Sequence, residues 1–225
     1  MPKRKFSTLN SEDQLYFNKK SKSEPERLET HVDDYQNLLG GGDSVQIKDN
    51  HIYFYGKVSN SNCLKLNIAI REVSRKLSLV RIDLGVDNLK IYLHINSFGG
   101  SVFAALATID TIRNCPYEVV SIIEGAAASA ATLISVVCHE RIISRNAYML
   151  IHQMSSGFWG KMEEIKDEFL NLKKLSKNLK KIYKEHTKLN NKSTSEIKLS
   201  EILKRDIWWD SEECLRYGLV DKIDG

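Results

Sequence analysis

Three residue types that together can perform acyl transfer occur in order along this sequence. Ser129 lies in the small-residue stretch GAAASAAT, His152 follows the apolar run AYMLI, and Asp206 precedes the bulky run IWW. A serine hydroxyl is a weak nucleophile at neutral pH, so it needs a base to accept its proton and a third group to orient that base. The three residues therefore predict a nucleophile, a general base and an orienting acid.

Two interpretations of Ser129 are open from its own stretch. Its small neighbours would let a substrate carbonyl approach, and a position at a helix start would let the Ala130 N–H join an oxyanion pocket. In the other interpretation, alanine and serine let a helix pack closely against its neighbour. The stretch alone favours packing, and only partner residues change that balance.

His152 is the candidate base because a strand would carry it to the sheet edge where sites of α/β folds gather. The other histidines occupy a tail, early strands, a charged turn and a lysine-rich helix: His31, His51, His94, His139 and His186. A single histidine at a strand end is more often structural, so the inference depends on an acid.

Two aspartates near the end of the chain compete for that role. Asp210 stands three residues before Glu213, which is the acidic form of a capping box, so we expect Asp210 to cap the helix that ends near Tyr217. Asp206 has no such local task and is the better candidate for orienting His152. It could instead be a surface acid paired with Arg205.

A glycine pair offers backbone donors for the same chemistry. The stretch HINSFGGSV predicts a strand that turns into a helix at Gly99 and Gly100. Adjacent glycines let a ligand approach the backbone, and N–H groups at a helix start can bind a developing oxyanion. Gly-Gly turns are common, so this pattern also fits an ordinary turn.

Strands and helices alternate through the part of the chain that carries these residues. This alternation predicts an α/β layered domain with buried, largely parallel strands. The expected strands cover residues 51–58, 88–97, 118–125, 140–144 and 147–153, and the expected helices cover 61–77, 100–115 and the stretch after 125.

A long amphipathic helix is expected over 161–189, where apolar residues recur every three or four positions. It could pack on its own domain or form an oligomer interface. Residues 1–45 are polar, charged or glycine-rich and predict a flexible N-terminal extension, with a short helix around 33–39. We therefore expect a folded domain over 46–225.

The composition excludes several classes of protein. The chain has 225 residues, a net charge of +4 and 28% charged residues of alternating sign, which argues against a nucleic-acid partner. The four cysteines are scattered, so we expect neither disulfides nor zinc and a reducing, cytoplasmic compartment. The first thirty residues contain no apolar stretch, so we expect no secretory signal. The longest apolar run is too short for a membrane span.

Taken together, four motifs in this order resemble ClpP, the proteolytic subunit family of Clp proteases. HINSFGGSV is similar to that family's INSPGGSV, and EGAAASAATL to its GMAASMGxxL. MLIHQMSSG is similar to MIHQPxGG, and RDIWWDSEECLRYGLVDKI to RDxFxxAEEAxxYGLID. The resemblance covers roughly Asn50–Ile223.

The resemblance implies roles for the residues already named. Ser129 would be the nucleophile, His152 the base and Asp206 its orienting acid. Gly100 and Ala130 would lend N–H groups to the oxyanion hole, with Gly99 shaping the turn.

The resemblance also implies an architecture and partners. The fold would be the ClpP/crotonase-like fold of repeated ββα units, and the helix at 161–189 (the handle helix) would protrude between two stacked heptameric rings. Polypeptide substrates would be fed to this tetradecamer by a hexameric AAA+ unfoldase that uses ATP. The subunit itself would need no metal, nucleotide or other cofactor.

Departures from the family pattern leave alternatives open. Phe98 and Met154 replace two prolines, and residues 1–45 do not resemble the family's N-terminal segment. A viral or phage processing protease that acts without an unfoldase, and would work in a host cytoplasm or organelle, is one alternative. A non-catalytic ring subunit and an acyl-CoA hydratase or isomerase are the others, although the last leaves the Ser–His–Asp set unexplained.

Overall fold

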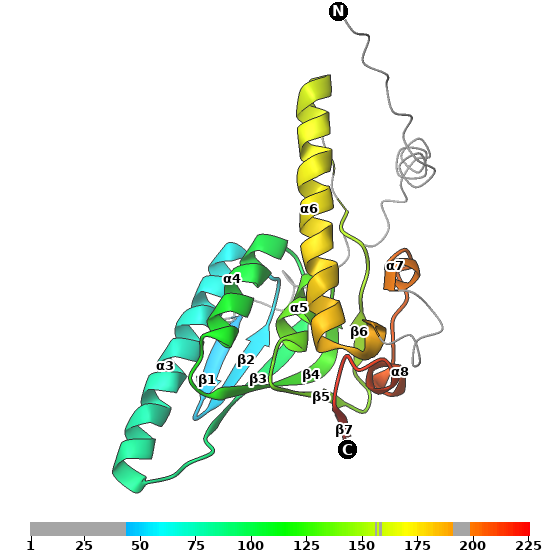
Figure 1. Cartoon of the computed structure of the whole chain (residues 1–225). Helices are drawn as coiled ribbons and strands as arrows, with labels where there is room; N and C mark the ends of the chain where they lie inside the picture. The colour runs from blue at the N-terminus through cyan, green and yellow to red at the C-terminus, as the bar shows by residue number, and fades with distance from the viewer. Residues whose placement is uncertain (1–43, 156, 158, 191–198) are drawn as a thin grey trace, which may run out of the picture. The chain divides into compact units, whose positions relative to one another are not determined.

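The computed structural model describes residues 44–155, 157, 159–190 and 199–225 (Figure 1). The short helix expected around 33–39 lies outside these residues. The strands are β1 (Val45–Lys48), β2 (His51–Tyr55), β3 (Lys90–Ser97), β4 (Glu118–Ala128), β5 (Glu140–Ser144), β6 (Tyr148–Leu150) and β7 (Lys222–Asp224). The helices are α3 (Asn60–Leu84), α4 (Val102–Arg113), α5 (Ala130–Val136), α6 (Met162–His186), α7 (Leu199–Ile202) and α8 (Ser211–Arg216), with a short 3-10 helix η1 (Lys188–Asn190).

The described strands form one seven-stranded sheet in the order β1-β2-β3-β4-β5-β7, and β6 pairs with the far end of β4. All pairs are parallel except the β1–β2 hairpin. The α/β class with parallel strands is confirmed. β1 was not predicted, because its four residues VQIK are too few and too polar to stand out in the sequence.

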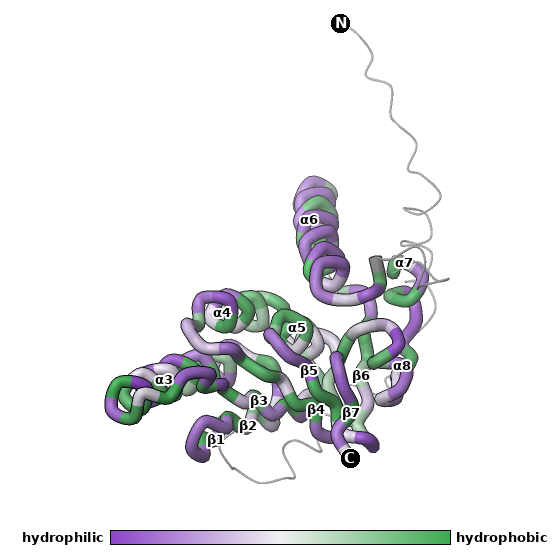
Figure 2. The backbone as a smooth tube through the Cα atoms, turned by 60° about the horizontal axis from the view of Figure 1, so that its bottom comes forward, coloured by the Kyte–Doolittle hydropathy of each residue, from purple (hydrophilic) through white to green (hydrophobic). Residues whose placement is uncertain are grey.

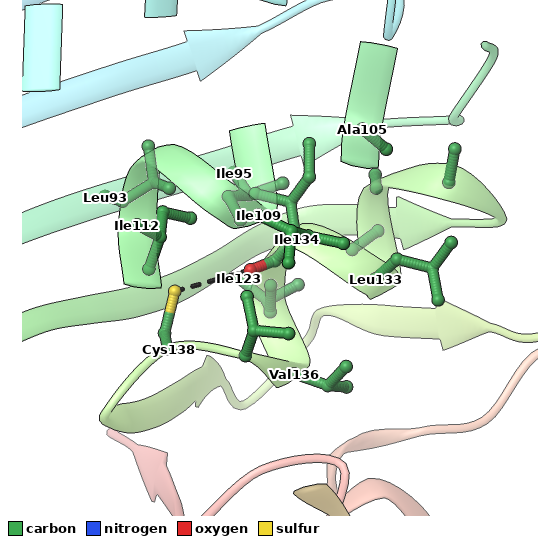
Figure 3. Packing of buried hydrophobic residues seen from close by; sticks show 14 of the residues in the cluster. Leu93, Ile95, Ala105, Ile109, Ile112, Ile123, Leu133, Ile134, Val136 and Cys138 are labelled. Carbon is green, nitrogen blue, oxygen red and sulfur yellow. Dashed lines mark hydrogen bonds between the residues drawn. The ribbon is translucent and has the colours of Figure 1, made fainter. Parts of the chain in front are cut away.

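Helices α3, α4 and α5 lie on one face of this sheet (Figure 1). The core between the two layers is made of fully buried aliphatic side chains from both. Figure 3 shows them interlocking: Leu93 and Ile95 of β3, Ile109 and Ile112 of α4, Ile123 of β4, and Ile134 of α5. The close packing of such a core fixes the ends of β3 and β4, which Gly99 and Ser129 follow.

Two elements run past their predicted ends, whereas β2 and β6 stop short of theirs, at Tyr55 and Leu150. α3 begins where Ser59 accepts a hydrogen bond from the Asn62 N–H and continues to Gly85, whose φ of 63° ends it. It therefore runs past the expected end at residue 77. β4 extends through the small residues to Ala128, because Ala126 pairs with Tyr148 of β6. These alanines were expected in a helix, and pairing with β6 overrides their helix propensity.

The long helix expected over 161–189 is confirmed as α6, which extends away from the sheet (Figure 1). Hydrophilic and hydrophobic residues alternate along it (Figure 2). Its buried residues, Leu179, Ile182 and Tyr183, all lie in its C-terminal part, whereas Met162 and Leu170 are exposed. Only the C-terminal part of α6 therefore packs on the domain.

Candidate active site

One row of backbone pairing crosses four segments of the domain. Ser97 of β3 pairs with Ala127 of β4, and Ala127 pairs with Met149 of β6. Met149 in turn forms an isolated antiparallel bridge with Trp209. Segments that are distant in sequence are thus aligned side by side at the carboxyl ends of β3 and β4.

The predicted site residues all lie just beyond this row. Gly99 follows Ser97 by two residues, Ser129 follows Ala127 by two, and His152 follows Met149 by three. The segment that carries Trp209 runs antiparallel, so the residue on the same side is the one three positions earlier, Asp206. The pairing therefore brings the glycine turn, the serine, the histidine and the aspartate to one place.

Ser129 occupies a sharp turn between β4 and α5. Its φ of 54° and ψ of −124° are rare for a residue with a side chain, and such conformations cost roughly 1–3 kcal/mol. The turn is held by the Ser129 N–H, which donates to Leu150 O at 2.8 Å. The Ser129 side chain does not cap α5, so its hydroxyl is left available. A strained strand-to-helix turn of this kind is how hydrolases expose a nucleophile.

His152 and Asp206 lie side by side. His152 Nδ1 lies 3.5 Å from Asp206 Oδ1, which is longer than a good hydrogen bond. Their segments are joined on both sides, because the Gln153 N–H donates to Leu203 O at 2.7 Å and Met149 bridges Trp209. The Asp206 side chain is 79% exposed, so the backbone and not burial places it.

The described side chains of Ser129 and His152 share no hydrogen bond in this structure. The Ser129 N–H nevertheless bonds to Leu150, only two residues before His152. Catalytic hydrogen bonds are often long or misaligned in free enzymes and tighten when substrate binds. The hydrogen bond to Leu150 therefore holds Ser129 and His152 on neighbouring segments.

The glycine turn lies directly against the serine. A Cβ on Gly99 would lie 2.7 Å from Ser129 Cβ and 3.1 Å from the Ala130 nitrogen, and its φ is +94°. Only glycine fits there. Ala130 is the first residue of α5, where an N–H has no partner within the helix.

Gly100 presents its N–H away from the neighbouring segment. The Val58 N–H donates to Gly99 O and the Ser101 N–H donates to Val58 O, at 2.8 and 2.7 Å. In a parallel bridge of this type, the residue between the two bonded ones turns its own N–H and C=O away. The backbone N–H groups of Gly100 and Ala130 are therefore both available to an oxyanion.

The two aspartates make different contacts, and the predicted cap at Asp210 is confirmed. Asp210 caps α8 with Oδ1 accepting from the Glu213 N–H at 2.8 Å, and the Glu213 carboxylate accepts from the Asp210 N–H. Among the described residues, Asp206 lies against His152 and forms no ion pair with Arg205. The surface-pair alternative for Asp206 is not what the structure contains.

The other described histidines are engaged elsewhere. His51 and His94 bond each other at 2.8 Å, and His139 Nδ1 accepts from the Val119 N–H at 3.1 Å. His186 contacts Arg113 at 3.2 Å. His152 is thus the histidine that the described fold brings to the serine turn.

Two contacts beside the site were missed by the sequence analysis. Phe98 and Trp208 pack edge to face, with ring centroids 5.9 Å apart. The Tyr183 hydroxyl of α6 lies 2.6 Å from Thr132 Oγ1 of α5. Each joins segments far apart in the sequence, so no local pattern could have indicated either.

A polar cluster on β2, β3 and β4 was also missed. His94 Nδ1 lies 2.8 Å from a Glu124 carboxylate oxygen, and Tyr55 donates to the same carboxylate. Burial and the neighbouring His94 lower the pKa of His51, and burial with the Glu124 bond raises the pKa of Tyr55 to about 12. Only the pairing of three strands brings these four residues together.

Two further absences concern only the described part of the chain. It contains no group of three or more histidine, cysteine, aspartate or glutamate residues that could hold a metal ion, and its cysteines are free thiols. Within the same residues, no helix combines the length and the apolar character that crossing a membrane requires.

Comparisons with known proteins agree with this geometry. The Clp protease family model matches residues 50–224. The ATP-dependent Clp protease proteolytic subunit of Streptococcus mutans is 39% identical over 140 residues, which cover 61% of this chain and 70% of that protein. Subunit 1 of Leifsonia xyli is 32% identical over 180 residues, 79% of this chain and 84% of that protein. Subunit 1 of Streptomyces avermitilis is 38% identical over 135 residues, 59% and 60% of the two chains. The chain therefore belongs to the Clp protease family, as its four motifs predicted.

Proposed function

We propose that this chain is the proteolytic subunit of a Clp-type protease, a serine endopeptidase that hydrolyses peptide bonds of unfolded polypeptides. Ser129 is the nucleophile, His152 the general base and Asp206 the acid that orients it. The observation that carries the proposal is the pairing of Met149 with both Ala127 and Trp209, which aligns the segments of all three residues.

The reaction proceeds in two halves. Ser129 Oγ attacks the carbonyl carbon as His152 takes the hydroxyl proton, and the C–N bond breaks as His152 gives that proton to the leaving amine. Water then attacks the acyl-enzyme with His152 again as base, which releases the carboxylic acid product and restores the Ser129 hydroxyl.

Backbone donors stabilise the charge that develops on the carbonyl oxygen. The N–H groups of Gly100 and Ala130 are the donors, and Gly99 permits the close approach of their two turns. Removing one such donor in other serine hydrolases costs roughly 10²- to 10³-fold in kcat. Because these donors are backbone groups, the sequence determines their positions through Gly99 and Gly100.

The proposal includes an assembly and a partner. The long exposed part of α6 carries apolar residues such as Met162 and Leu170, which favours contact with a second copy. Two stacked heptameric rings that enclose the active sites, and a hexameric AAA+ unfoldase that uses ATP, complete the proposed protease. Sedimentation velocity of the purified protein tests the ring, because fourteen copies of a 25.7 kDa chain differ clearly from smaller assemblies.

The mechanism uses only side chains and backbone N–H groups. We therefore expect peptide hydrolysis by the subunit to survive dialysis against a chelator and to need no nucleotide. The free thiols Cys63, Cys115, Cys138 and Cys214 favour a reducing compartment, and the proposed site of action is the cytoplasm.

The Ser129→Ala variant tests the proposal directly. Alanine keeps the Cβ, so the turn experiences no new contact, and the variant should assemble like the parent chain. Hydrolysis of a short fluorogenic peptide should fall by at least about 10³-fold. Retention of the parent rate in an assembled Ser129→Ala protein would overturn the assignment.

A further inference from the structure

The backbone N–H and C=O of Ser129, whose backbone is strained, are both hydrogen-bonded. The Ser129 N–H donates to Leu150 O at 2.8 Å. The Ser129 carbonyl accepts from the Thr132 N–H at 3.1 Å and from the Thr132 hydroxyl at 2.6 Å. Because φ and ψ of Ser129 lie in a costly region, these bonds counter a tendency of the turn to relax.

The hydroxyl of Thr132 is itself bonded to α6. Thr132 Oγ1 lies 2.6 Å from the Tyr183 hydroxyl. Thr132 has one hydroxyl proton, and it is directed to the Ser129 carbonyl, so Tyr183 must be the donor between them. The order of donation is therefore from Tyr183 to Thr132 and from Thr132 to Ser129.

Both donors in this chain of hydrogen bonds are buried. The exposed fraction of Thr132 is 0% and that of Tyr183 is 4%. Burial raises the pKa of Tyr183, so its hydroxyl stays protonated and can donate a hydrogen bond. In a site that excludes water, consecutive hydrogen bonds polarise and strengthen one another. The base of α6 lies beside α5, as Figure 1 shows.

We propose that Thr132 and Tyr183 are positioning residues that fix the backbone of the nucleophile: the Tyr183 hydroxyl orients the Thr132 hydroxyl, which holds the Ser129 carbonyl and so sets the direction of Oγ. This inference rests on the proposed function of Ser129. It assigns a role in catalysis to a tyrosine of the handle helix that the reaction itself does not use.

A purely structural role makes a different prediction. If the contact only joins α6 to α5, its loss lowers stability and leaves the chemical step unchanged. If it positions the nucleophile, its loss lowers kcat while KM stays the same, because substrate binds elsewhere in the site and only the reacting oxygen is displaced.

The test uses three variants of the full chain in its assembled form. Tyr183→Phe removes the first donor and keeps the ring. Thr132→Val removes the bond to the Ser129 carbonyl and keeps the shape, whereas Thr132→Ser keeps a hydroxyl. With a short fluorogenic peptide, we expect kcat to fall about fivefold in Tyr183→Phe and more in Thr132→Val, with KM unchanged. Thr132→Ser should retain most of the parent kcat.

The double variant separates the relay from two independent effects. If Tyr183 acts through Thr132, adding Tyr183→Phe to Thr132→Val lowers kcat no further. It should also restore some stability, since it removes a buried hydroxyl left without a partner. Multiplicative losses in kcat would overturn the inference.

Ile182→Val is the matched control. Ile182 is the neighbour of Tyr183 on α6, is 4% exposed, and loses one methylene in this variant. It should cost comparable stability with the parent kcat. Equal losses of kcat in Ile182→Val and Tyr183→Phe would reduce Tyr183 to a packing residue and overturn the proposal.

Failure of the proposed function is recognised separately. A parent protein that neither hydrolyses peptides nor reacts with a fluorophosphonate at Ser129 would overturn both proposals. A parent that does both, with kcat unchanged in Tyr183→Phe and in Thr132→Val, would overturn only the positioning role.

Discussion

Met149 and Trp209 exchange two backbone hydrogen bonds, of 2.9 and 2.8 Å, across sixty residues of sequence. This antiparallel contact attaches the segment of Asp206 to β6, which ends two residues before His152. A side chain that is 79% exposed would otherwise have little to hold it near the imidazole. Asp206 is thus positioned by its backbone, and the exchange of main-chain bonds is independent of the side chains at Met149 and Trp209.

Asp206→Asn tests whether this positioned acid orients the base. An amide cannot hold the imidazole in the tautomer that accepts the serine proton, so kcat should fall roughly 10²- to 10⁴-fold. Steady-state hydrolysis of a fluorogenic peptide measures it. Asp210→Asn is the control, since asparagine also caps helices and should leave the rate unchanged. Equal rates in Asp206→Asn and the parent chain would remove Asp206 from the site.

Gly99→Ala should abolish activity through contact and not merely through backbone strain. Its Cβ would lie 2.6 Å from Ala128 O and 2.7 Å from Ser129 Cβ, which displaces the nucleophile. Gly85→Ala is the control, because Gly85 also has a positive φ, of +63°, but nothing lies within 4 Å. It should cost about 1–2 kcal/mol of unfolding free energy with normal kcat. A Gly99→Ala protein with the parent kcat would contradict the account of the oxyanion turn.

The ring contact between Phe98 and Trp208 ties the oxyanion turn to the loop that carries Asp206. An edge-to-face pair is worth roughly 0.5–1.5 kcal/mol beyond its buried area. Phe98→Leu should therefore lower kcat/KM about two- to tenfold, measured by peptide hydrolysis. Phe103→Leu makes the same change on an exposed ring of α4 and should have no effect. A Phe98→Leu protein as active as Phe103→Leu would show that the contact is incidental.

The sequence predicted those features of the fold and the site whose pattern lies within one stretch of residues. Asp210 and Glu213 stand three residues apart, a spacing that predicts a capping box, and the capping box is confirmed. The alternation of strands and helices likewise predicted the α/β layers. The long stripe of α6 predicted its helix because the period of 3.6 residues persists over many turns.

Other features had no local signal. The alanines 126–128 have high helix propensity, yet β6 recruits them into the sheet, and only the fold reveals that pairing. β1 is short and polar and was missed. The contacts of Tyr183 with Thr132 and of Phe98 with Trp208 join distant segments, so neither could be inferred without the packing of α6 and of the Asp206 loop.

Stability should depend on pH through two histidines away from the site. Burial and the neighbouring His94 lower the pKa of His51. Burial, Arg113 and Arg141 lower the pKa of His186. In the unfolded chain the two histidines are protonated near pH 6.5, whereas in the folded protein they are protonated only at lower pH. Their contribution to the free energy of unfolding is therefore complete above pH 6.5 and is lost as the pH falls through the folded pKa values.

Denaturant unfolding of the parent chain and of a His51→Gln/His186→Gln variant measures this dependence between about pH 7.5 and about pH 5.5. The parent should lose more stability across the interval than the double variant. A variant with the same pH slope as the parent would show that these two histidines do not cause it.

Covalent labelling asks directly whether residue 129 is an activated serine. The purified, assembled protein is treated with a fluorophosphonate and the modified peptide is located by mass spectrometry, beside a His152→Ala variant. We expect one label, on Ser129, in the parent chain and none in the variant within the same time. Absence of label on Ser129 in the assembled parent, or equal labelling of the His152→Ala variant, would contradict it.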